Sequence, residues 1–212
     1  MGLPEVSDLC YHLWLQGISE IDNRPTTAFT KDLLRDPAAR GASDVIHTVT
    51  AVGSSSSKAS AERFISDLKI PGSVNAYGSY EELVKDPNVD IIYVATPHSH
   101  HFQNTMLALE AGKHVLCEKA FTVNAAQAKI LCETAQKKNL FLMEAVWTRY
   151  FPISIQIREH IQKGTIGEVL RVVADNSIGA DPENAWDSSH RMVNMDLAGG
   201  ALLDCMFSFS FH

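Results

Sequence analysis

Short apolar runs rich in β-branched residues alternate with longer amphipathic stretches from about residue 48 onward. This alternation is typical of βαβ units, in which crossover helices join parallel strands. One run, Val89–Ala95, is almost continuously apolar, as expected for a central strand that helices cover on both faces. The other predicted strands are Thr48–Val52, His114–Cys117, Leu140–Met143 and Val169–Ala174.

The segments between these runs have the period of amphipathic helices, and several helix ends are marked. The run Ser79-Tyr80-Glu81-Glu82 has the spacing of a capping box, and Pro152 suits the first turn of a helix. Gly112 and Gly164 fall where a left-handed residue would end a helix. The sequence therefore predicts an α/β fold. Its predicted helices are Thr27–Leu34, Lys58–Leu68, Tyr80–Val84, His100–Ala111, Ala125–Lys137 and Ser154–Gln162.

The two ends of the chain fit this pattern poorly. Met1–Arg24 offers no Val/Ile-rich strand, and Gly17 stands alone where a doubly wound sheet usually opens with a strand and G-x-G-x-x-G. At the other end, Gly199–Asp204 has the character of a helix start or turn. The chain then closes on a tail that contains Phe207, Phe209 and Phe211. We therefore expect the first strand and its glycine loop to be atypical or missing, and both ends to be truncated.

Composition narrows the class of protein. The chain has 212 residues, of which 45% are hydrophobic and 20% charged, as in an ordinary globular protein rather than a disordered or collagenous one. Its net charge of −7 works against nucleic acid or an anionic membrane as a partner. The four cysteines form no C-x-x-C pair, which fits a reducing compartment. With neither a signal-peptide start nor 18 consecutive apolar residues, a cytoplasmic protein is expected.

Residues that could bind a ligand or take part in catalysis follow two neighbouring predicted strands. Thr96–His101 comes directly after the central strand, and Cys117–Ala120 ends the next strand, at the edge where open α/β sheets bind ligands. Together with Asn124, Glu144–Arg149 and Gly199–Asp204, these segments resemble the glucose-fructose oxidoreductase, inositol dehydrogenase and MocA family. Within that family, the motifs are most similar to those of the dimeric dihydrodiol dehydrogenases and the NADP-dependent D-xylose 1-dehydrogenases.

This resemblance implies a Rossmann-like parallel sheet followed by a truncated α+β domain. The expected division is an atypical N-terminal segment over residues 1–26, a dinucleotide-binding domain over 27–151 and a truncated substrate domain over 152–212. In the family, the second domain is an open antiparallel sheet through which relatives often pair. A homodimer is therefore a further expectation from the resemblance.

Lys119 corresponds to the family's catalytic lysine, close to the nicotinamide and the reacting hydroxyl. A lysine in a pocket can handle the hydroxyl proton or stabilise charge on the oxygen. The alternative is an exposed lysine at a strand end. Two positions depart from the family: Ala120 replaces the usual proline, so the loop is expected to differ, and Ser208 occupies the position of the catalytic tyrosine, four residues after Asp204. No catalytic tyrosine is carried over.

The segment after the second predicted strand indicates the cofactor. NAD enzymes place an acidic residue there against the ribose 2′-hydroxyl, and none is present. Serine hydroxyls and a lysine ammonium can instead hold a 2′-phosphate, which predicts NADP; the alternative is a flexible serine linker. The candidate residues here are Ser54, Ser55, Ser56, Ser57 and Lys58, and the resemblance adds Thr96, Pro97, His98, His101, Glu118 and Lys119.

The clustered histidines His98, His100 and His101 also raise a zinc site, because imidazoles are common zinc ligands. No cysteine or acid nearby completes a ligand set, and in the resembled family this loop lines the dinucleotide site. We therefore expect no metal, and cofactor contacts from His98 and His101.

Aromatic and basic residues follow the last strand of the first domain. Trp147, Arg149 and Phe151 lie where the family places substrate contacts, although packing between domains would equally explain them. A second polar stretch, which could also reach the site, contains Asp187, His190 and Arg191.

The function expected from the resemblance is an NADP-dependent oxidoreductase acting on a small molecule, either a sugar such as D-xylose or a trans-dihydrodiol. The alternative is a non-catalytic, truncated relative that binds other molecules, or an incomplete gene product. The missing first strand and glycine loop, and Ser208 at the tyrosine position, are the features that favour this alternative.

Overall fold

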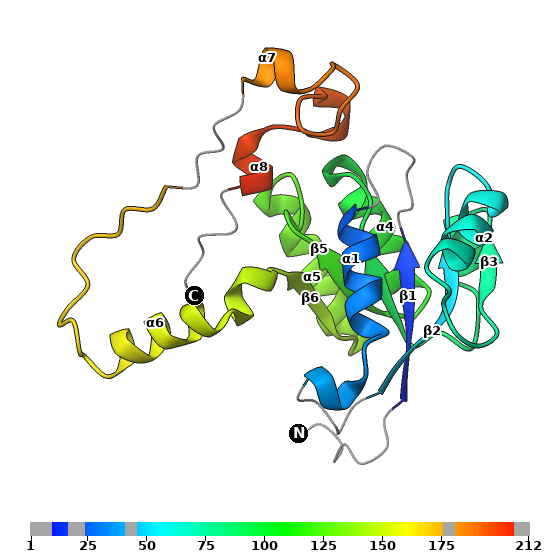
Figure 1. Ribbon diagram of the computed structural model, residues 1–212, viewed down its shortest axis with the longest axis horizontal. Coiled ribbons are helices and arrows are strands. Elements are labelled where there is room, and N and C mark those ends of the chain that lie inside the picture. Colours follow the sequence, from blue (N-terminus) through cyan, green and yellow to red (C-terminus); the bar gives the residue numbers. More distant parts are fainter. Residues whose placement is uncertain (1–9, 17–23, 41–45, 176–180, 206–212) are drawn as a thin grey trace.

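A computed structural model describes residues 10–16, 24–40, 46–175 and 181–205. Within these ranges, six strands form one parallel sheet in the order β3-β2-β1-β4-β5-β6 (Figure 1). The chain therefore winds outward in both directions from β1 and β4, as in a doubly wound α/β fold. The strands are β1 (Cys10–Gln16), β2 (Ile46–Gly53), β3 (Asn75–Tyr77), β4 (Ile91–Val94), β5 (His114–Glu118) and β6 (Leu142–Ala145).

The predicted helix signals are confirmed. Ser79 accepts a hydrogen bond from the backbone N–H of Glu82, Gly112 and Gly164 have positive φ angles, and Pro152 begins a helix. The α-helices are α1 (Arg24–Leu33), α2 (Lys58–Asp67), α3 (Tyr80–Leu83), α4 (His98–Glu110), α5 (Ala125–Lys138), α6 (Pro152–Gln162), α7 (Pro182–Ala185) and α8 (Ala201–Cys205). The described part of the chain also contains the short 3-10 helices η1 (Pro37–Arg40), η2 (Trp147–Tyr150) and η3 (Met195–Leu197).

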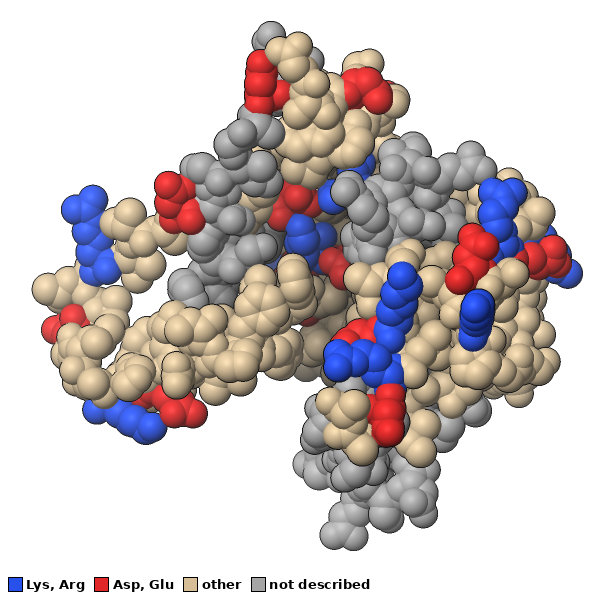
Figure 2. Space-filling view, viewed as in Figure 1, with Lys and Arg blue, Asp and Glu red and all other residues tan. Residues whose placement is uncertain are grey.

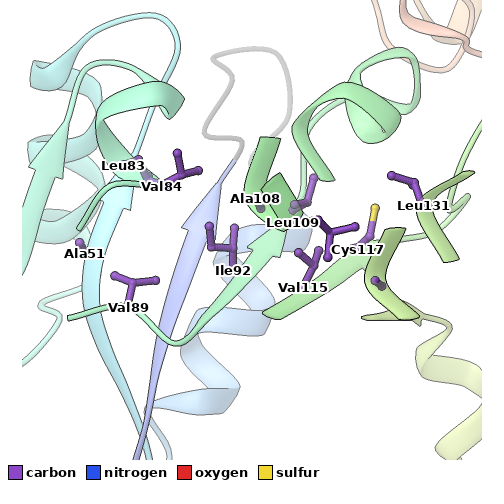
Figure 3. Close-up of a cluster of buried hydrophobic side chains, with 12 residues drawn as sticks. Ala51, Leu83, Val84, Val89, Ile92, Ala108, Leu109, Val115, Cys117 and Leu131 are labelled. Atoms are coloured by element: carbon purple, nitrogen blue, oxygen red, sulfur yellow. The ribbon is translucent and has the colours of Figure 1, made fainter. Parts of the chain in front are cut away.

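Hydrophobic cores cover both faces of the sheet. Successive residues of β4 point to opposite sides, so that Ile92 and Val94 enter one core and Tyr93 the other. The first core lies between the sheet and α3, α4 and α5 (Figure 3), and the second takes in side chains of α1 and α2. The prediction of a central strand covered on both faces is confirmed. Residues at the core of Figure 3 include Leu83, Leu109, Val115, Cys117 and Leu131.

The first strand, which we expected to be atypical or missing, is present and is atypical in sequence. Cys10–Gln16 forms β1, which pairs with β2 on one side and with β4 on the other. Its sequence contains neither valine nor isoleucine, so the pattern of β-branched residues could not reveal it. Residues 17–23, where a glycine loop would follow, lie outside the described part of the chain.

The prediction of a strand at Val169–Ala174 is wrong. These residues are exposed and have no secondary structure, and they follow α6, which extends away from the sheet (Figure 1). A β-branched run becomes a strand only where a neighbouring backbone completes its hydrogen bonds. Other elements differ in their bounds: α1 begins at Arg24 rather than Thr27, α4 begins at His98 rather than His100, and β6 is Leu142–Ala145 rather than Leu140–Met143.

The remaining C-terminal expectations divide in two. The helix or turn predicted at Gly199–Asp204 is confirmed by α8, whereas Ser208 and the phenylalanine tail lie outside the described residues. Within the described ranges, no helix is long and apolar enough to cross a membrane. Acidic and basic side chains of the described residues are interspersed on the face shown in Figure 2.

Candidate active site

The parallel sheet brings four predicted site segments to one edge. Because all six strands run in the same direction, the residues that directly follow them share the edge formed by the carboxyl ends. Ser54–Lys58 follows β2, Thr96–His101 follows β4, Lys119 follows β5, and Trp147–Phe151 follows β6.

Lys119 binds the carboxylate of Asp204, which lies 85 positions later in the sequence. Its Nζ donates hydrogen bonds to the backbone oxygen of Asp204 at 2.6 Å and to Asp204 Oδ1 at 3.0 Å. Arg191 Nη1 donates to the same Oδ1 at 2.9 Å. The side chains of Lys119 and Asp204 are only 17% and 14% exposed. The alternative of an exposed strand-end lysine is therefore wrong, and we call Lys119, Asp204 and Arg191 the ion triad.

The charge state of Asp204 follows from its neighbours. Burial acts to raise the pKa of this carboxyl group, but the hydrogen bond from Arg191 and the positive charge of Lys119 outweigh burial and lower the pKa overall. Asp204 is therefore an ionised acceptor that holds two cations at the end of α8.

Glu118 fixes the backbone just before Lys119. Its Oε2 accepts the N–H of Lys119 at 3.1 Å, and its Oε1 accepts the hydroxyl of Tyr93. Burial raises the pKa of both Glu118 and Tyr93. The Tyr93 ring stacks on Phe29 of α1, with 4.1 Å between ring centroids. Sequence analysis missed Tyr93, because a tyrosine within an apolar strand has the signature of a core residue.

His101 joins the turn after β5 to the end of β4. The Lys119–Ala120 peptide bond is cis, and the oxygen of Ala120 lies 2.6 Å from His101 Nδ1. His101 Nε2 lies 2.7 Å from the oxygen of Thr96, whose hydroxyl accepts a hydrogen bond from Asn104. The two carbonyl oxygens favour the protonated ring, but burial is the larger effect and lowers the pKa of His101 to about 4. The neutral ring carries one N–H and donates it to one of the two oxygens, so His101 is a buried side chain packed between two loops of the site.

His98 faces the ion triad from the first turn of α4. Its Nδ1 lies 3.1 Å from the oxygen of Ala198, and its Nε2 lies 3.9 Å from Asp204 Oδ1. Burial lowers the pKa of His98, against the opposing effect of Asp204. Within the described ranges, no group of three His, Cys, Asp or Glu residues could hold a metal ion. His98 thus connects the sheet edge to the loop that precedes α8.

The serines after β2 form a hydrogen-bonded turn rather than an extended linker. Ser54 is fully buried, and its hydroxyl lies 2.8 Å from that of Ser56. Ser57 caps α2 by accepting the N–H of Ser60 at 3.1 Å. The Lys58 side chain is 65% exposed at the start of the helix. The Lys58 ammonium lies 4.0 Å from Glu62 Oε1, one helical turn further along α2. The exposed hydroxyls, the helix N-terminus and the ammonium together fit a 2′-phosphate.

The predicted substrate residues lie on η2 and at its end. The rings of Trp147 and Phe151 meet edge to face with 5.1 Å between centroids, and Trp147 is 62% exposed. Arg149 belongs to η2 and lies between these two residues in the sequence. These residues share the sheet edge with Lys119, and their contact with a substrate stays a prediction.

The three candidate residues of the second polar stretch, Asp187, His190 and Arg191, make different contacts. Arg191 reaches the ion triad, as the sequence suggested for this stretch. His190 instead stacks on Trp186, and Asp187 accepts hydrogen bonds from Ser189. Arg191 is therefore the member of the stretch that the structure brings to the site.

Comparison with known proteins assigns the family. Residues 29–146 match the oxidoreductase family with an NAD-binding Rossmann fold, GFO_IDH_MocA. The chain belongs to this family. It is 66% identical over 180 residues to the D-xylose 1-dehydrogenase (NADP(+)) of Hypocrea jecorina, covering 83% of this chain and 46% of that protein. It is 47% identical over 146 residues to the trans-1,2-dihydrobenzene-1,2-diol dehydrogenase of Mus musculus, covering 68% and 40%.

Solved structures of similar proteins agree with the GFO_IDH_MocA assignment. An NAD binding oxidoreductase from Klebsiella pneumoniae has a TM-score of 0.64 and 27% identity, covering 76% of this chain and 40% of that one. The 3-ketoreductase KijD10 from Actinomadura kijaniata, in complex with NADP, has a TM-score of 0.58 and 29% identity, covering 76% and 46%. The chain spans less than half the length of the curated relatives named above.

Proposed function

We propose that this GFO_IDH_MocA chain carries the dinucleotide site and catalytic lysine of an NADP-dependent oxidoreductase. The observation that carries the proposal is the burial of Lys119 in the ion triad at the carboxyl end of β5. The proposed reaction is hydride transfer between the nicotinamide and either a sugar such as D-xylose or a trans-dihydrodiol. The names of the two relatives support these substrates.

The proposed domain division places the dinucleotide-binding domain over residues 27–151, together with β1, and the substrate domain over 152–212. The presence of β1 removes one of the features that favoured a non-catalytic relative. We also propose that the protein is cytoplasmic, forms a homodimer and has no nucleic-acid partner. The net charge of −7 works against a nucleic-acid partner, and the free thiols of Cys117, Cys132 and Cys205 fit a reducing compartment. The homodimer is proposed from the family resemblance.

NADP would be held along the edge formed by the carboxyl ends of the strands. When bound, the nicotinamide supplies the site that accepts or gives up hydride. The exposed Ser55, Ser56, Ser57 and Lys58 would hold the 2′-phosphate through hydroxyls and one ammonium, and the buried Ser54 would position Ser56. The other proposed cofactor contacts are Thr96, Pro97, His98, Glu118 and Lys119. The buried His101 would act indirectly, through its contacts with Thr96 and Ala120.

Lys119 would exchange the proton that accompanies hydride transfer. Two of its three ammonium N–H groups bind Asp204, so one remains for a substrate oxygen. In carbonyl reduction the ammonium gives a proton to the oxygen while the carbon gains hydride. In alcohol oxidation the neutral amine takes the hydroxyl proton while the carbon loses hydride. Trp147, Arg149 and Phe151 would form the substrate wall beside it.

The cofactor part is tested by titrating the chain with NADPH and with NADH, following energy transfer from its three tryptophans. NADPH should bind at least about tenfold more tightly than NADH, because a charge-assisted contact to the 2′-phosphate contributes about 1.5 kcal/mol or more. Equal affinities would contradict the role of the serine turn.

The catalytic part is tested in the same preparation with D-xylose and a trans-dihydrodiol. Lys119→Ala should lower kcat about 100-fold or more and leave NADPH binding intact. The exposed Lys163→Ala is the matched control. NADPH binding without turnover of either substrate would favour the non-catalytic alternative.

A further inference from the structure

Arg191 shares one carboxylate oxygen with the proposed catalytic lysine. Its Nη1 lies 2.9 Å from Asp204 Oδ1, and Lys119 Nζ lies 3.0 Å from that same atom. The guanidinium is 26% exposed, so the contact is shielded from bulk solvent more than an ordinary surface ion pair. The proposed proton transfer uses Lys119 and leaves the role of Arg191 open.

The loop that presents Arg191 is tightly folded. The N–H groups of Val193 and Asn194 both bond the oxygen of His190, at 3.0 and 2.9 Å. The N–H of Gly199 returns to the oxygen of Asn194 at 2.9 Å. Since the neighbouring Ala198 oxygen also contacts His98 of α4, the loop is held against the sheet edge. Arg191 thus approaches Asp204 from a fixed direction.

Sharing Oδ1 limits how Lys119 can bind Asp204. With Arg191 on this oxygen, Lys119 makes one bond to the carboxylate and one to the backbone oxygen, which leaves its third N–H for another acceptor. Without Arg191, the carboxylate could rotate and present both oxygens to Lys119. The ammonium would then be drawn further into the ion pair and away from a substrate.

We propose that Arg191 is a positioning residue, which holds the Asp204 carboxylate so that Lys119 keeps one N–H available to the substrate oxygen. This inference deepens the proposed function and rests on it for its catalytic consequence. Asp204 faces Lys119 after β5, Arg191 from the loop and His98 from α4, with Glu118 close to both cations.

The first test needs no turnover. Carbon-13 NMR of labelled aspartate carboxyl groups, assigned with Asp204→Asn, follows the titration of Asp204. Arg191→Met should move this titration to higher pH, because one of the two groups that offset burial is lost. Arg191→Lys should restore part of the shift, and the exposed Arg171→Met should leave it unchanged. An identical Asp204 titration in wild type and Arg191→Met would overturn the proposal.

The second test separates positioning from folding. In Arg191→Met, kcat should fall at least tenfold and its acid limb should move to higher pH, while NADPH affinity stays within twofold. Arg191→Lys should recover part of kcat, since it keeps one donor but not the planar fork. A loss of kcat with an unmoved acid limb would instead indicate a merely structural role and overturn the proposal.

Two further outcomes are distinguishable. If wild type binds NADPH but turns over neither substrate, the proposed function fails, and the Asp204 titration alone decides whether Arg191 controls the carboxylate. If Arg191→Met does not fold, as judged by circular dichroism, Arg191→Lys and Arg191→Gln carry the same comparisons.

Discussion

Gly199 allows the loop that carries Arg191 to close on itself. A Cβ atom at this position would lie 2.4 Å from the oxygen of Arg191 and 2.8 Å from the oxygen of Asn194. Both contacts are with backbone atoms, so rotation of a side chain cannot relieve them. The neighbouring Ala198 has a positive φ of 54°. Its backbone is left-handed, which is unfavourable for an alanine, whereas the limit at Gly199 is the space available for a Cβ atom.

Gly199→Ala should therefore destabilise the protein by about 1–3 kcal/mol, as expected for overpacking against a fixed backbone. Its kcat should fall together with that of Arg191→Met, because the loop that presents the guanidinium must move. Ala198→Gly, one residue away, should remain within about 1 kcal/mol of wild type, since relief of left-handed strain offsets the greater freedom of the unfolded chain. Urea denaturation of the three proteins gives the comparison, and equal stability of Gly199→Ala and wild type would contradict the argument.

Single residues were predictable from the sequence where a motif names them. The resemblance of their motif to the family pointed to Lys119 and Glu118, and the structure puts both at the carboxyl end of β5. Tyr93 was not predicted, because only the fold brings its hydroxyl to Glu118 across two strands. The contact of Lys119 with Asp204 joins residues 85 positions apart, which no local pattern encodes.

At the level of elements, two helices begin with the same kind of cap but in different surroundings. Asn124 caps α5 by accepting the N–H of Gln127 at 3.0 Å, and Ser57 caps α2 within the serine turn. A side-chain cap of this kind stabilises a helix by about 1 kcal/mol. The two caps should therefore contribute similarly to folding and differently to cofactor binding.

Asn124→Ala and Ser57→Ala should each lower the free energy of unfolding by about 1 kcal/mol. Only Ser57→Ala should weaken NADPH binding, because its hydroxyl belongs to the proposed phosphate site. Asn124→Ser should retain most of the stability, which checks that the cap is responsible. Urea denaturation and the NADPH titration measure both effects, and a matching loss of NADPH affinity in Asn124→Ala would count against a specific role for the serine turn.

Elements were predictable where local pattern and tertiary environment agree. The apolar run Val89–Ala95 contains β4, since a buried central strand must be apolar on both faces. The side-chain pattern of β1 does not indicate a strand. Its backbone pairs with β2 on one side and β4 on the other, and this pairing stabilises it as a strand. Val169–Ala174 shows the converse, because β-branched residues there have no neighbouring strand within the described chain.

Across the whole molecule, one buried carboxylate attaches the edge strand β3 to the body of the sheet. Asp86 Oδ2 accepts hydrogen bonds from Asn75 Nδ2 and the Tyr77 hydroxyl, both at 3.0 Å, and Oδ1 accepts the N–H of Asn88 at 2.8 Å. The backbone oxygen of Asp86 accepts Lys113 Nζ at 2.7 Å, which links this turn to the start of β5. Protonation of the Asp86 carboxylate would therefore weaken the contacts of this turn with β3.

The acid stability of the protein should depend on Asp86. Burial acts to raise the pKa of this carboxyl group, but the hydrogen bonds from Asn88, Asn75 and Tyr77 prevail and lower it from the ordinary value of 3.8. A carboxyl group with a lower pKa in the folded state stabilises the fold above its unfolded pKa. That contribution is lost as the pH falls from about 3.8 through the folded value.

Asp86→Asn should therefore lower Tm at pH 7, and the difference from wild type should shrink as the pH is lowered below about 3.8, where wild type also loses the charge. The exposed Asp67→Asn is the control and should follow wild type at every pH. Calorimetric melting curves from pH 2.5 to pH 7 measure both differences. A difference that stays constant over this range would contradict the role of the charge and attribute the effect to the lost acceptor, because asparagine fills the same space but accepts at one oxygen only.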